Sequence, residues 1–217
     1  MLHALAHAIP HLVIMEPDQG LDLDVELMRR VARQDDHAFR LLVERHQSAV
    51  YGTILKMLGD PIEAEDIAQQ VFIRVYRAAP QYQPSAQFRT WLFTIVRNLV
   101  FNEHRRRSRA WFFSIDQQPE EESDAPAFEL PDTLTKAADR EVMDREMMES
   151  IDKAILSLPE QQRIAVVLRR YDEFSYDEIA EVMKVSVPSV KSLLFRARET
   201  LRQKLSHYMQ GGGPEEE

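Results

Sequence analysis

The sequence predicts an all-α fold of two small helical domains joined by an acidic flexible linker. Helix-forming residues dominate the composition, and only 6 of the 217 residues are glycine. Apolar residues recur at spacings of three and four in two stretches, residues 21–109 and residues 139–208. Residues 110–138 lack this periodicity and are rich in proline and acidic residues, as linkers are. A chain of this length can form two separate cores.

The two ends of the chain are predicted to lie outside these domains. Residues 1–20 are expected to form a flexible extension, and residues 209–217 a disordered tail. Three histidines recur every four residues in the extension, and on a helix this spacing could gather a metal ion. Pro10 interrupts that helix and no carboxylate completes the site, so no metal and no cofactor are predicted. The histidines are His3, His7 and His11.

In the first stretch, cap and breaker residues divide the chain into successive helices. A short first helix, a longer second one and a third that ends near Pro80 are predicted. Gly59 stops the second helix, and Asp60 and Pro61 start the third as its N-cap and first helical residue. A loop at residues 80–84 then precedes a long helix. That helix begins near Phe88 and runs toward Arg107, with Phe88, Trp91, Leu92, Ile95, Val96 and Leu99 on its apolar side.

The second stretch ends in a predicted helix-turn-helix over residues 175–205. Upstream of it, Leu158-Pro159 separates two further helices. Ser175 and Glu178 form an S-x-x-E capping box, a reciprocal hydrogen-bonding start signal for the first helix of the motif. The predicted turn is Lys184-Val185, followed by the cap residue Ser186 and by Pro188 in the first turn of the second helix.

The second helix of this motif separates an apolar side from a basic one. A helix can enter the major groove of DNA, where basic side chains read guanine and phosphate and a ring meets a thymine methyl. The pattern therefore indicates DNA binding, and the alternative is a solvated amphipathic helix at the end of a bundle. The apolar side is Val190, Leu193, Leu194, Ala197, Leu201 and Leu205. The opposite side carries Ser189, Lys191, Ser192, Phe195, Arg196, Arg198 and Arg202.

The long helix from Phe88 carries a second candidate nucleic-acid site. Asn98, Asn102 and Arg105 lie on one side of it at i, i+4 and i+7, and a run of arginines follows. Tyr82 lies in the preceding loop. Rings, amides and arginines suit single-stranded nucleic acid, whose unstacked bases stack on rings and expose their edges. For Phe88 and Trp91 the simpler interpretation, a place in the core, is favoured, and it stays open for Tyr82.

The acidic net charge of -9 conceals two basic segments, residues 97–109 and residues 184–204. The acidic residues are concentrated in the linker and in the last three residues. A polyanion such as DNA interacts with a local basic surface, so the net charge of the whole chain does not exclude DNA binding. Cysteine is absent, which excludes disulfides and thiol catalysis and is consistent with a cytoplasmic protein. No run of apolar residues is long enough for a membrane span. The acidic linker residues are Asp116, Glu120, Glu121, Glu122, Asp124, Glu129 and Asp132.

Three stretches of the chain resemble the functional regions of one family, the bacterial RNA polymerase sigma factors of the extracytoplasmic-function group within the sigma-70 family. The stretch AEDIAQQVFIRVYRA at 64–78 resembles the region that binds the polymerase core. The stretch FRTWLFTIVRNLVFNEHRRR at 88–107 resembles the part of region 2 that melts and reads the −10 promoter element. Residues 158–201 resemble region 4, which reads the −35 element with its helix-turn-helix.

The resemblance implies a transcription initiation factor that is not an enzyme. Its implied partners are core RNA polymerase (the clamp helices of the largest subunit, and the flap), promoter DNA and an anti-sigma factor, in the cytoplasm and on the nucleoid when bound to polymerase. For the −35 duplex the implied residues are Arg169, Ser189, Lys191, Ser192, Phe195, Arg196 and Arg198. For the −10 element they are Tyr82, Asn98, Asn102, Arg105 and Arg106, and for the polymerase core Asp66, Gln69, Gln70 and Arg74.

Three other classes of protein compete with this interpretation. An ordinary helix-turn-helix regulator would bind duplex DNA without polymerase, and it has no need of the polar face at 64–78 or of Asn98. A hydrolase or metal enzyme is disfavoured because the chain has no HExxH, phosphate-binding glycine loop or nucleophile elbow. An adaptor that only binds another regulator stays open.

Overall fold

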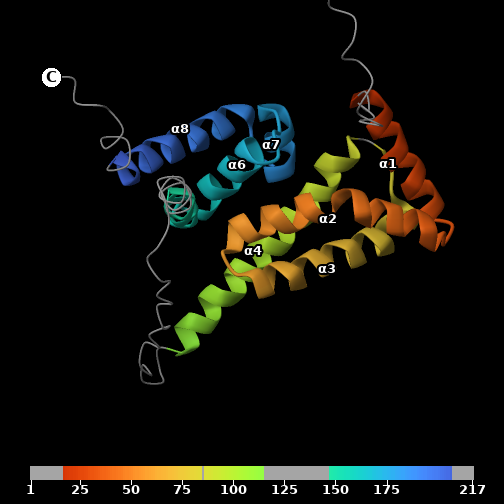
Figure 1. The fold of residues 1–217 in the computed structure, drawn as a ribbon, viewed down its shortest axis with the longest axis horizontal. Coiled ribbons are helices and arrows are strands. Elements are labelled where there is room, and N and C mark those ends of the chain that lie inside the picture. The colour runs from red at the N-terminus through yellow and green to blue at the C-terminus, as the bar shows by residue number, and fades with distance from the viewer. Residues whose placement is uncertain (1–16, 85, 115–146, 207–217) are drawn as a thin grey trace, which may run out of the picture.

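A computed structural model describes residues 17–84, 86–114 and 147–206 of the chain. The described residues form helices and no strand, which confirms the all-α prediction, and they pack into two helical domains (Figure 1). The first domain holds α1 (Pro17–Val31), α2 (Asp36–Leu58), α3 (Pro61–Ala78), the 3₁₀ turn η1 (Ala79–Gln81) and α4 (Phe88–Ser114). The second holds a helix over residues 147–156, α6 (Glu160–Arg170), α7 (Tyr176–Met183) and α8 (Val187–Lys204).

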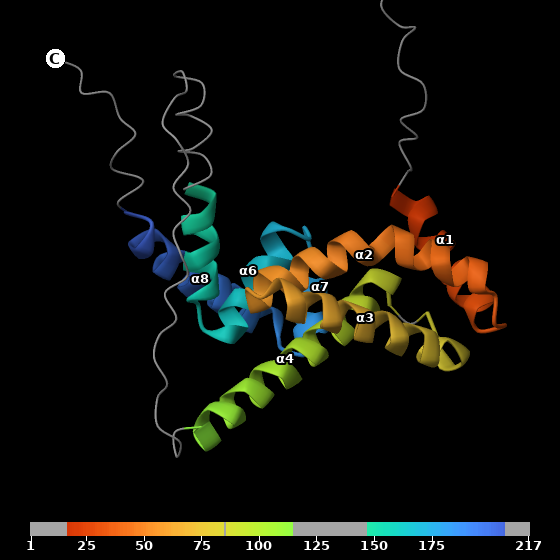
Figure 2. The same ribbon diagram turned by 60° about the horizontal axis from the view of Figure 1, so that its bottom comes forward.

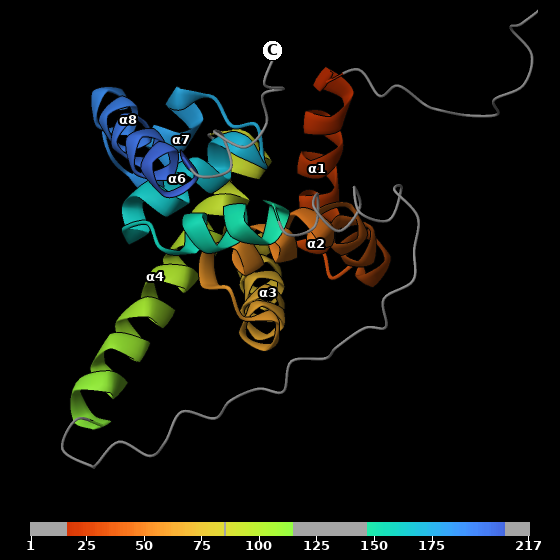
Figure 3. The ribbon, with the colours of Figure 1, turned by 60° about the vertical axis from the view of Figure 1, so that its left-hand side comes forward.

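Two helix boundaries differ from the sequence prediction. Helix α1 begins at Pro17, inside the predicted extension, and α4 continues to Ser114, past the predicted end near Arg107. No glycine or proline interrupts residues 108–114, so nothing local stops the helix there. The C-terminal part of α4 projects beyond the other helices (Figure 3). The other residues predicted as extension, linker and tail, with His3, His7 and His11, lie outside the described residues.

The first domain is built around α2, which packs against α1, α3 and α4 (Figure 2). Gly59 ends α2 in the left-handed conformation, with φ of 76°, and its N–H donates to the Leu55 carbonyl. The Asp60 carboxylate accepts hydrogen bonds from two backbone N–H groups of α3, and Pro61 follows it. These are the stop and start signals that the sequence predicts. The largest fully buried side chains of this domain are Phe88, Phe93, Leu27, Met28, Leu42, Ile54, Met57 and Leu92.

The helix-turn-helix forms with the predicted caps. Both hydrogen bonds of the capping box are present, from the Glu178 N–H to the Ser175 hydroxyl and from the Ser175 N–H to the Glu178 carboxylate. Lys184 ends α7 in the left-handed conformation and so turns the chain. The Ser186 hydroxyl then caps α8, and Pro188 lies in its first turn. The orientation of α8 on α7 is therefore set largely by local signals.

The two domains are docked on each other, which the sequence did not predict. Helix α7 packs against α4, and α6 packs against α2. The Thr53 hydroxyl on α2 donates a 2.7 Å hydrogen bond to the buried Asp172 carboxylate of the second domain. Close by, Lys56 on α2 contacts both carboxylate oxygens of Asp152, at 2.5 and 2.7 Å. Polar pairing and packing thus hold the domains together.

Burial raises the pKa of Asp172 to about 6, although the Thr53 hydrogen bond and the nearby Arg89 guanidinium act in the opposite direction. The docked chain therefore holds the proton more tightly than a separated second domain does. Protonation of Asp172 therefore favours docking. By linkage, this contribution to the free energy of docking is fully present at pH values below the ordinary pKa of 3.8 and is lost as the pH rises through about 6. His104, at the same domain boundary, has its pKa lowered by burial and by Arg163, so it opposes this trend.

Replacing Asp172 by asparagine is expected to stabilise the chain at pH 8. Asparagine keeps an oxygen for Thr53 but has no proton to lose, so the expected gain is about 1–3 kcal/mol at pH 8 and shrinks toward pH 4. Urea unfolding of both proteins at several pH values measures it. His104, Lys56 and Arg89 are common to both proteins, so the difference between them isolates Asp172. A difference that does not change with pH would contradict the assignment.

Candidate nucleic-acid interface

Helix α8 presents most of the predicted duplex-reading residues on one open face. Val190, Leu194 and Ala197 are buried against the rest of the second domain, so the opposite side of α8 turns outward. Phe195 is 70% exposed there, so its ring is accessible to a binding partner. The neighbouring exposed residues are Ser189, Lys191, Ser192 and Arg196. A ring flanked by cations and hydroxyls can contact the edges and backbone of duplex DNA.

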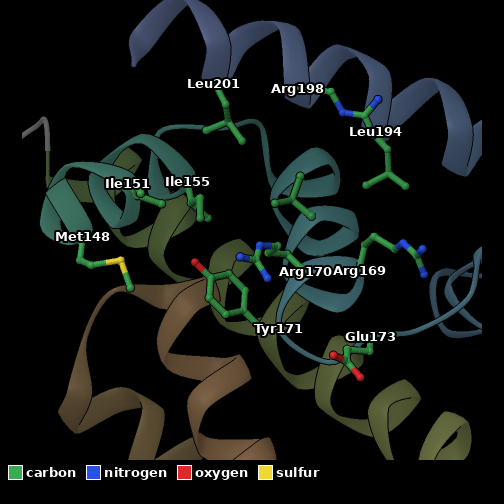
Figure 4. Close-up of a pocket in the computed structure, with 11 residues that line it drawn as sticks. Met148, Ile151, Ile155, Arg169, Arg170, Tyr171, Glu173, Leu194, Arg198 and Leu201 are labelled. Atoms are coloured by element: carbon green, nitrogen blue, oxygen red, sulfur yellow. The ribbon is translucent and has the colours of Figure 1, made fainter. Parts of the chain in front are cut away.

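Two predicted duplex-reading arginines, Arg198 and Arg169, lie instead in a hollow between α8, α6 and the helix 147–156 (Figure 4). The hollow has a volume of about 690 Å³. The Arg169 guanidinium donates a 2.8 Å hydrogen bond to the Phe174 carbonyl and lies 5.3 Å from the centre of the Tyr176 ring. Arg169 therefore braces the start of α7. The other residues that line the hollow are Met148, Ile151, Ile155, Val166, Arg170, Tyr171, Glu173, Leu194 and Leu201.

Tyr82 packs into an aromatic cluster at the start of α4. Its ring makes edge-on contacts with Trp91, at 4.9 Å between centroids, and with Phe88, at 6.0 Å. Its hydroxyl oxygen is buried with no hydrogen-bond partner among the described residues, and burial raises the pKa of that hydroxyl. Phe88 is buried and Trp91 half-buried, as predicted for core residues. The structure thus places Tyr82 with the core rings beside α4.

Asn98, the predicted base-reading amide, is half-buried and already paired. The Arg97 guanidinium donates a 2.8 Å hydrogen bond to the Asn98 side-chain oxygen. The same guanidinium donates a 3.0 Å hydrogen bond to the Met183 carbonyl, at the end of α7 in the other domain. It also stacks 4.7 Å from the centre of the Phe101 ring. The sequence analysis placed Arg97 only within a basic segment. In the structure Arg97 is the hydrogen-bond donor to the Asn98 side chain.

A groove between α3 and α4, with a volume of about 360 Å³, brings together two sets of residues that the sequence assigned to different partners. Asn102 and Arg106 of the predicted −10 site lie there with Asp66, Gln70 and Arg74 of the predicted polymerase site. Arg105 is exposed further along α4, and Gln69 is exposed on α3. The remaining lining residues are Glu63, Ile67, Leu99 and Glu103.

Arg106 is held in this groove by a carboxylate. Its guanidinium donates three hydrogen bonds, of 2.7 to 3.1 Å, to Glu103 one turn earlier. The bond from Arg106 is the main reason that the pKa of Glu103 is lowered. Glu63 on α3 adds a second carboxylate 3.8 Å from Arg106 and contacts Arg107 directly. Arg106 therefore already has two carboxylates beside it, and their negative charge weakens its attraction for a phosphate.

Sequence reasoning missed two apolar residues on the outer face of α3. Ile62 is 75% exposed and Ile73 is 48% exposed. Helical spacing places both of them on the side that carries Asp66, Gln69 and Gln70. An exposed face that mixes apolar and polar side chains is typical of a protein-binding surface. The sequence contained a signal for this surface, because both isoleucines fall outside the apolar stripe that the helical spacing predicts to be buried.

No group of three or more metal-ligating side chains occurs within residues 17–84, 86–114 and 147–206. In those same ranges, no helix is both long and apolar enough to cross a membrane.

Two family descriptions match the chain over the two domains. Residues 42–110 match Sigma-70 region 2, and residues 148–201 match Sigma-70, region 4. The first match covers most of α2, all of α3 and most of α4, and the second covers α6, α7 and most of α8. Together they span more than half of the 217 residues.

Curated relatives extend the similarity over most of the chain. The RNA polymerase sigma-H factor of Pseudomonas aeruginosa is 35% identical over 187 residues, which are 84% of this chain and 93% of the relative. The ECF RNA polymerase sigma-E factor of Escherichia coli K12 is 33% identical over 187 residues, 84% of this chain and 94% of that protein. The ECF RNA polymerase sigma factor SigW of Bacillus subtilis is 31% identical over 178 residues, 82% of this chain and 94% of SigW.

Solved structures share the fold. CnrH in complex with the cytosolic domain of CnrY aligns with a TM-score of 0.59 and 22% identity, over 88% of this chain and 100% of that one. The Bartonella quintana sigma factor RpoE, in complex with the anti-sigma factor NepR, aligns with a TM-score of 0.59 and 23% identity, over 77% of this chain and 96% of that one. The sequence matches to both sigma-70 regions and to the curated ECF relatives show that the chain belongs to the extracytoplasmic-function group of the sigma-70 family.

Proposed function

We propose that the chain binds core RNA polymerase and directs it to promoters by recognising a −35 and a −10 element. The −35 duplex meets the open face of α8, and a base unstacked from the −10 element binds beside Asn98 on α4. The protein performs no covalent step in this scheme, because the polymerase supplies the chemistry. In the corresponding domain assignment, residues 21–109 bind core polymerase and the −10 element, and residues 139–208 read the −35 element.

The observation that carries the proposal is the open face of α8. Phe195 stands exposed among basic and hydroxyl side chains on a helix whose other side is buried, and that helix follows a capped first helix and a tight turn. This is the arrangement in which a recognition helix enters the major groove. Lys191 and Arg196 supply cations for phosphate or guanine. Arg198 and Arg169 contribute from the side of the hollow.

For polymerase, the proposed contact is the outer face of α3. Asp66, Gln69 and Gln70 provide polar contacts, and the exposed Ile62 and Ile73 provide apolar area to bury. Arg74 lies in the adjoining groove with Asn102 and Arg106. This continuity supports a surface on which polymerase and −10 DNA are bound side by side.

Partners and location follow from this role. We propose that the chain acts in the cytoplasm, on the nucleoid when it is bound to polymerase, and that an anti-sigma factor restrains it. Of two solved structures with the same fold, one holds the sigma factor RpoE with the anti-sigma factor NepR, and the other holds CnrH with the cytosolic domain of CnrY. In polymerase the flap is the proposed contact of the second domain.

The proposed function is tested by mixing the purified chain with core RNA polymerase and a library of promoter fragments, and then sequencing the transcript starts. A shared −35 and −10 pattern upstream of the starts is expected only when the chain is present. Tight binding to double-stranded sites without polymerase, and no stimulated transcription with it, would favour an ordinary helix-turn-helix regulator instead.

Replacing Asn98 by alanine is expected to change the base preferred in the −10 element, because the amide that reads the base edge is removed. Binding to core polymerase is expected to stay unchanged, since the α3 face is intact. Promoter-library sequencing measures the base preference, and a gel-shift titration with core enzyme measures the binding. A loss of polymerase binding would instead assign Asn98 a structural role.

A further inference from the structure

Asp24 on α1 is a buried carboxylate that joins α1 to α2. Only 5% of the residue is exposed, and the Arg45 guanidinium donates a 2.9 Å hydrogen bond to one carboxylate oxygen. The Nε2 atom of His46 lies 3.0 Å from the other oxygen, so a proton on Nε2 is attracted to the carboxylate. Apolar side chains often replace a buried ion pair with no loss of stability. Stability alone is therefore a weak reason for a carboxylate at this position.

His46 carries this contact to the start of α4. Its ring packs against Phe88, at 5.1 Å between centroids. Phe88 in turn packs against Tyr82 at 6.0 Å and against Trp91 at 5.6 Å. Burial, with a smaller contribution from the charge of Asp24, raises the pKa of the Tyr82 hydroxyl. The carboxylate therefore acts on Tyr82 through this row of rings and through its charge.

Tyr82 attaches the loop before α4 to the core. Its side chain is half-buried, whereas Gln81, Gln83 and Pro84 beside it are exposed. The adjoining turn η1 packs against α1, the helix that carries Asp24. The position of this loop therefore depends on α1 as well as on α4.

Trp91 brings the row of rings to the proposed −10 site. It packs against Tyr82 in a T-shaped arrangement, at 4.9 Å between centroids. Trp91 and Asn98 are seven positions apart, so they share one side of α4. Bases that leave a duplex stack on aromatic rings. A shift of the Tyr82 and Trp91 rings would therefore move a stacking surface relative to the amide that reads the base edge.

We propose that Asp24 is a positioning residue of the −10 site, which orients His46, fixes the Tyr82 and Trp91 rings and so determines which −10 base is preferred. Asp24 acts through these side chains and does not itself touch DNA. The proposal rests on the proposed function, in which the −10 base binds beside Asn98. Binding residues have to be held within about 0.5 Å by neighbours that lock their rotamers, and Asp24 begins that support here.

The test compares substitutions of Asp24 with a matched control in the full chain. Asp24→Ala removes both contacts and releases the His46 ring. Asp24→Asn fits the same space, can accept from Arg45 and can donate to His46, so it is expected to keep the wild-type base preference. Asp35→Ala is the control, because the Asp35 carboxylate accepts a 2.9 Å hydrogen bond from Arg30 of α1 and caps α2. None of the hydrogen bonds of Asp35 among the described residues reaches the four rings.

Promoter-library transcription with core polymerase measures the base preference. Asp24→Ala is expected to lower discrimination between the preferred −10 base and the others by about tenfold, within the roughly 5- to 150-fold that a good base contact supplies. His46→Ala is expected to do the same, and the double variant no more than the larger single change, because both act through one route. His46→Ala leaves Asp24 paired with Arg45, so it tests the same connection if Asp24→Ala does not fold.

Trp91 fluorescence gives a second readout that needs no polymerase. The chain has two tryptophans, so a Trp111→Phe background leaves Trp91 as the source of the emission. Asp24→Ala and His46→Ala are expected to increase the quenching of Trp91 emission by acrylamide. Asp24→Asn and Asp35→Ala are expected to leave it at the wild-type level.

The proposal is overturned if Asp35→Ala changes the −10 preference as much as Asp24→Ala at a comparable loss of stability, measured by urea unfolding. It is equally overturned if neither Asp24→Ala nor His46→Ala changes the quenching of Trp91. Failure of the proposed function looks different, because the wild-type chain itself would then stimulate no transcription. Failure of the positioning leaves wild-type transcription intact, and Asp24→Ala then keeps the wild-type base preference.

Discussion

Replacing Arg196 by alanine is expected to weaken −35-dependent initiation by about 1–3 kcal/mol, which is roughly a 5- to 150-fold loss at subsaturating protein. Arg196 is exposed on α8, and among the described residues its guanidinium makes no hydrogen bond or ion pair. It is therefore available to form a bidentate contact with guanine or to pair with a phosphate. Run-off transcription with core polymerase, on promoters with and without the −35 element, measures the loss.

Arg202→Ala on the same helix is the matched control for Arg196. The Arg202 guanidinium is already bound to Glu199 by hydrogen bonds of 2.8 and 3.2 Å, so its removal is expected to have a much smaller effect. Salt separates the two kinds of contact, because a phosphate contact weakens with ionic strength for every sequence whereas a base contact also sets the preferred base. If Arg196→Ala and wild type initiate equally well, Arg196 makes no contact with the −35 element and is only a solvated side chain.

Replacing Phe174 by alanine is expected to lower the free energy of unfolding by about 3–5 kcal/mol. Phe174 is fully buried between the domains, where its ring packs on Phe93 and carries the Arg89 guanidinium on its face. Removing it opens a cavity that helices from two domains cannot easily fill. Urea unfolding followed by circular dichroism measures the change.

Phe195→Ala is the natural comparison for Phe174→Ala, because it makes the same chemical change on an exposed ring. Its effect on unfolding is expected to stay within about 0.5 kcal/mol. Initiation from −35 promoters is expected to fall nonetheless, since the exposed ring is proposed to contact DNA. If both substitutions destabilised the chain equally, Phe195 would belong to a packed surface and not to a binding face.

Much of the fold follows from signals only a few residues apart. The Ser175 hydroxyl and the Glu178 carboxylate satisfy each other's backbone groups, so the start of α7 needs no distant partner. Gly59, Asp60 and Pro61 end one helix and start the next in the same way. The end of α4 was predicted too early, since residues 108–114 contain no glycine or proline that would stop the helix.

Contacts between distant residues could not be predicted in this way. Thr53 and Asp172 are 119 positions apart, and nothing near either residue indicates that their side chains meet. The same holds for Arg97 and the Met183 carbonyl, 86 positions apart. The sequence therefore predicted two domains joined by a flexible linker, and it did not predict that the second domain packs against α4.

The helices, their caps, the basic face of α8 and the resemblance to sigma factors were all predictable from sequence, because periodicity and capping depend on neighbours within one or two turns. Which polar groups are engaged depends on tertiary packing. It placed Asn98 under Arg97, Asn102 and Arg106 in a groove with Asp66, and Ile62 and Ile73 on an open face. Burial and pairing in space depend on how whole helices pack, and helices of similar pattern can pack in more than one way.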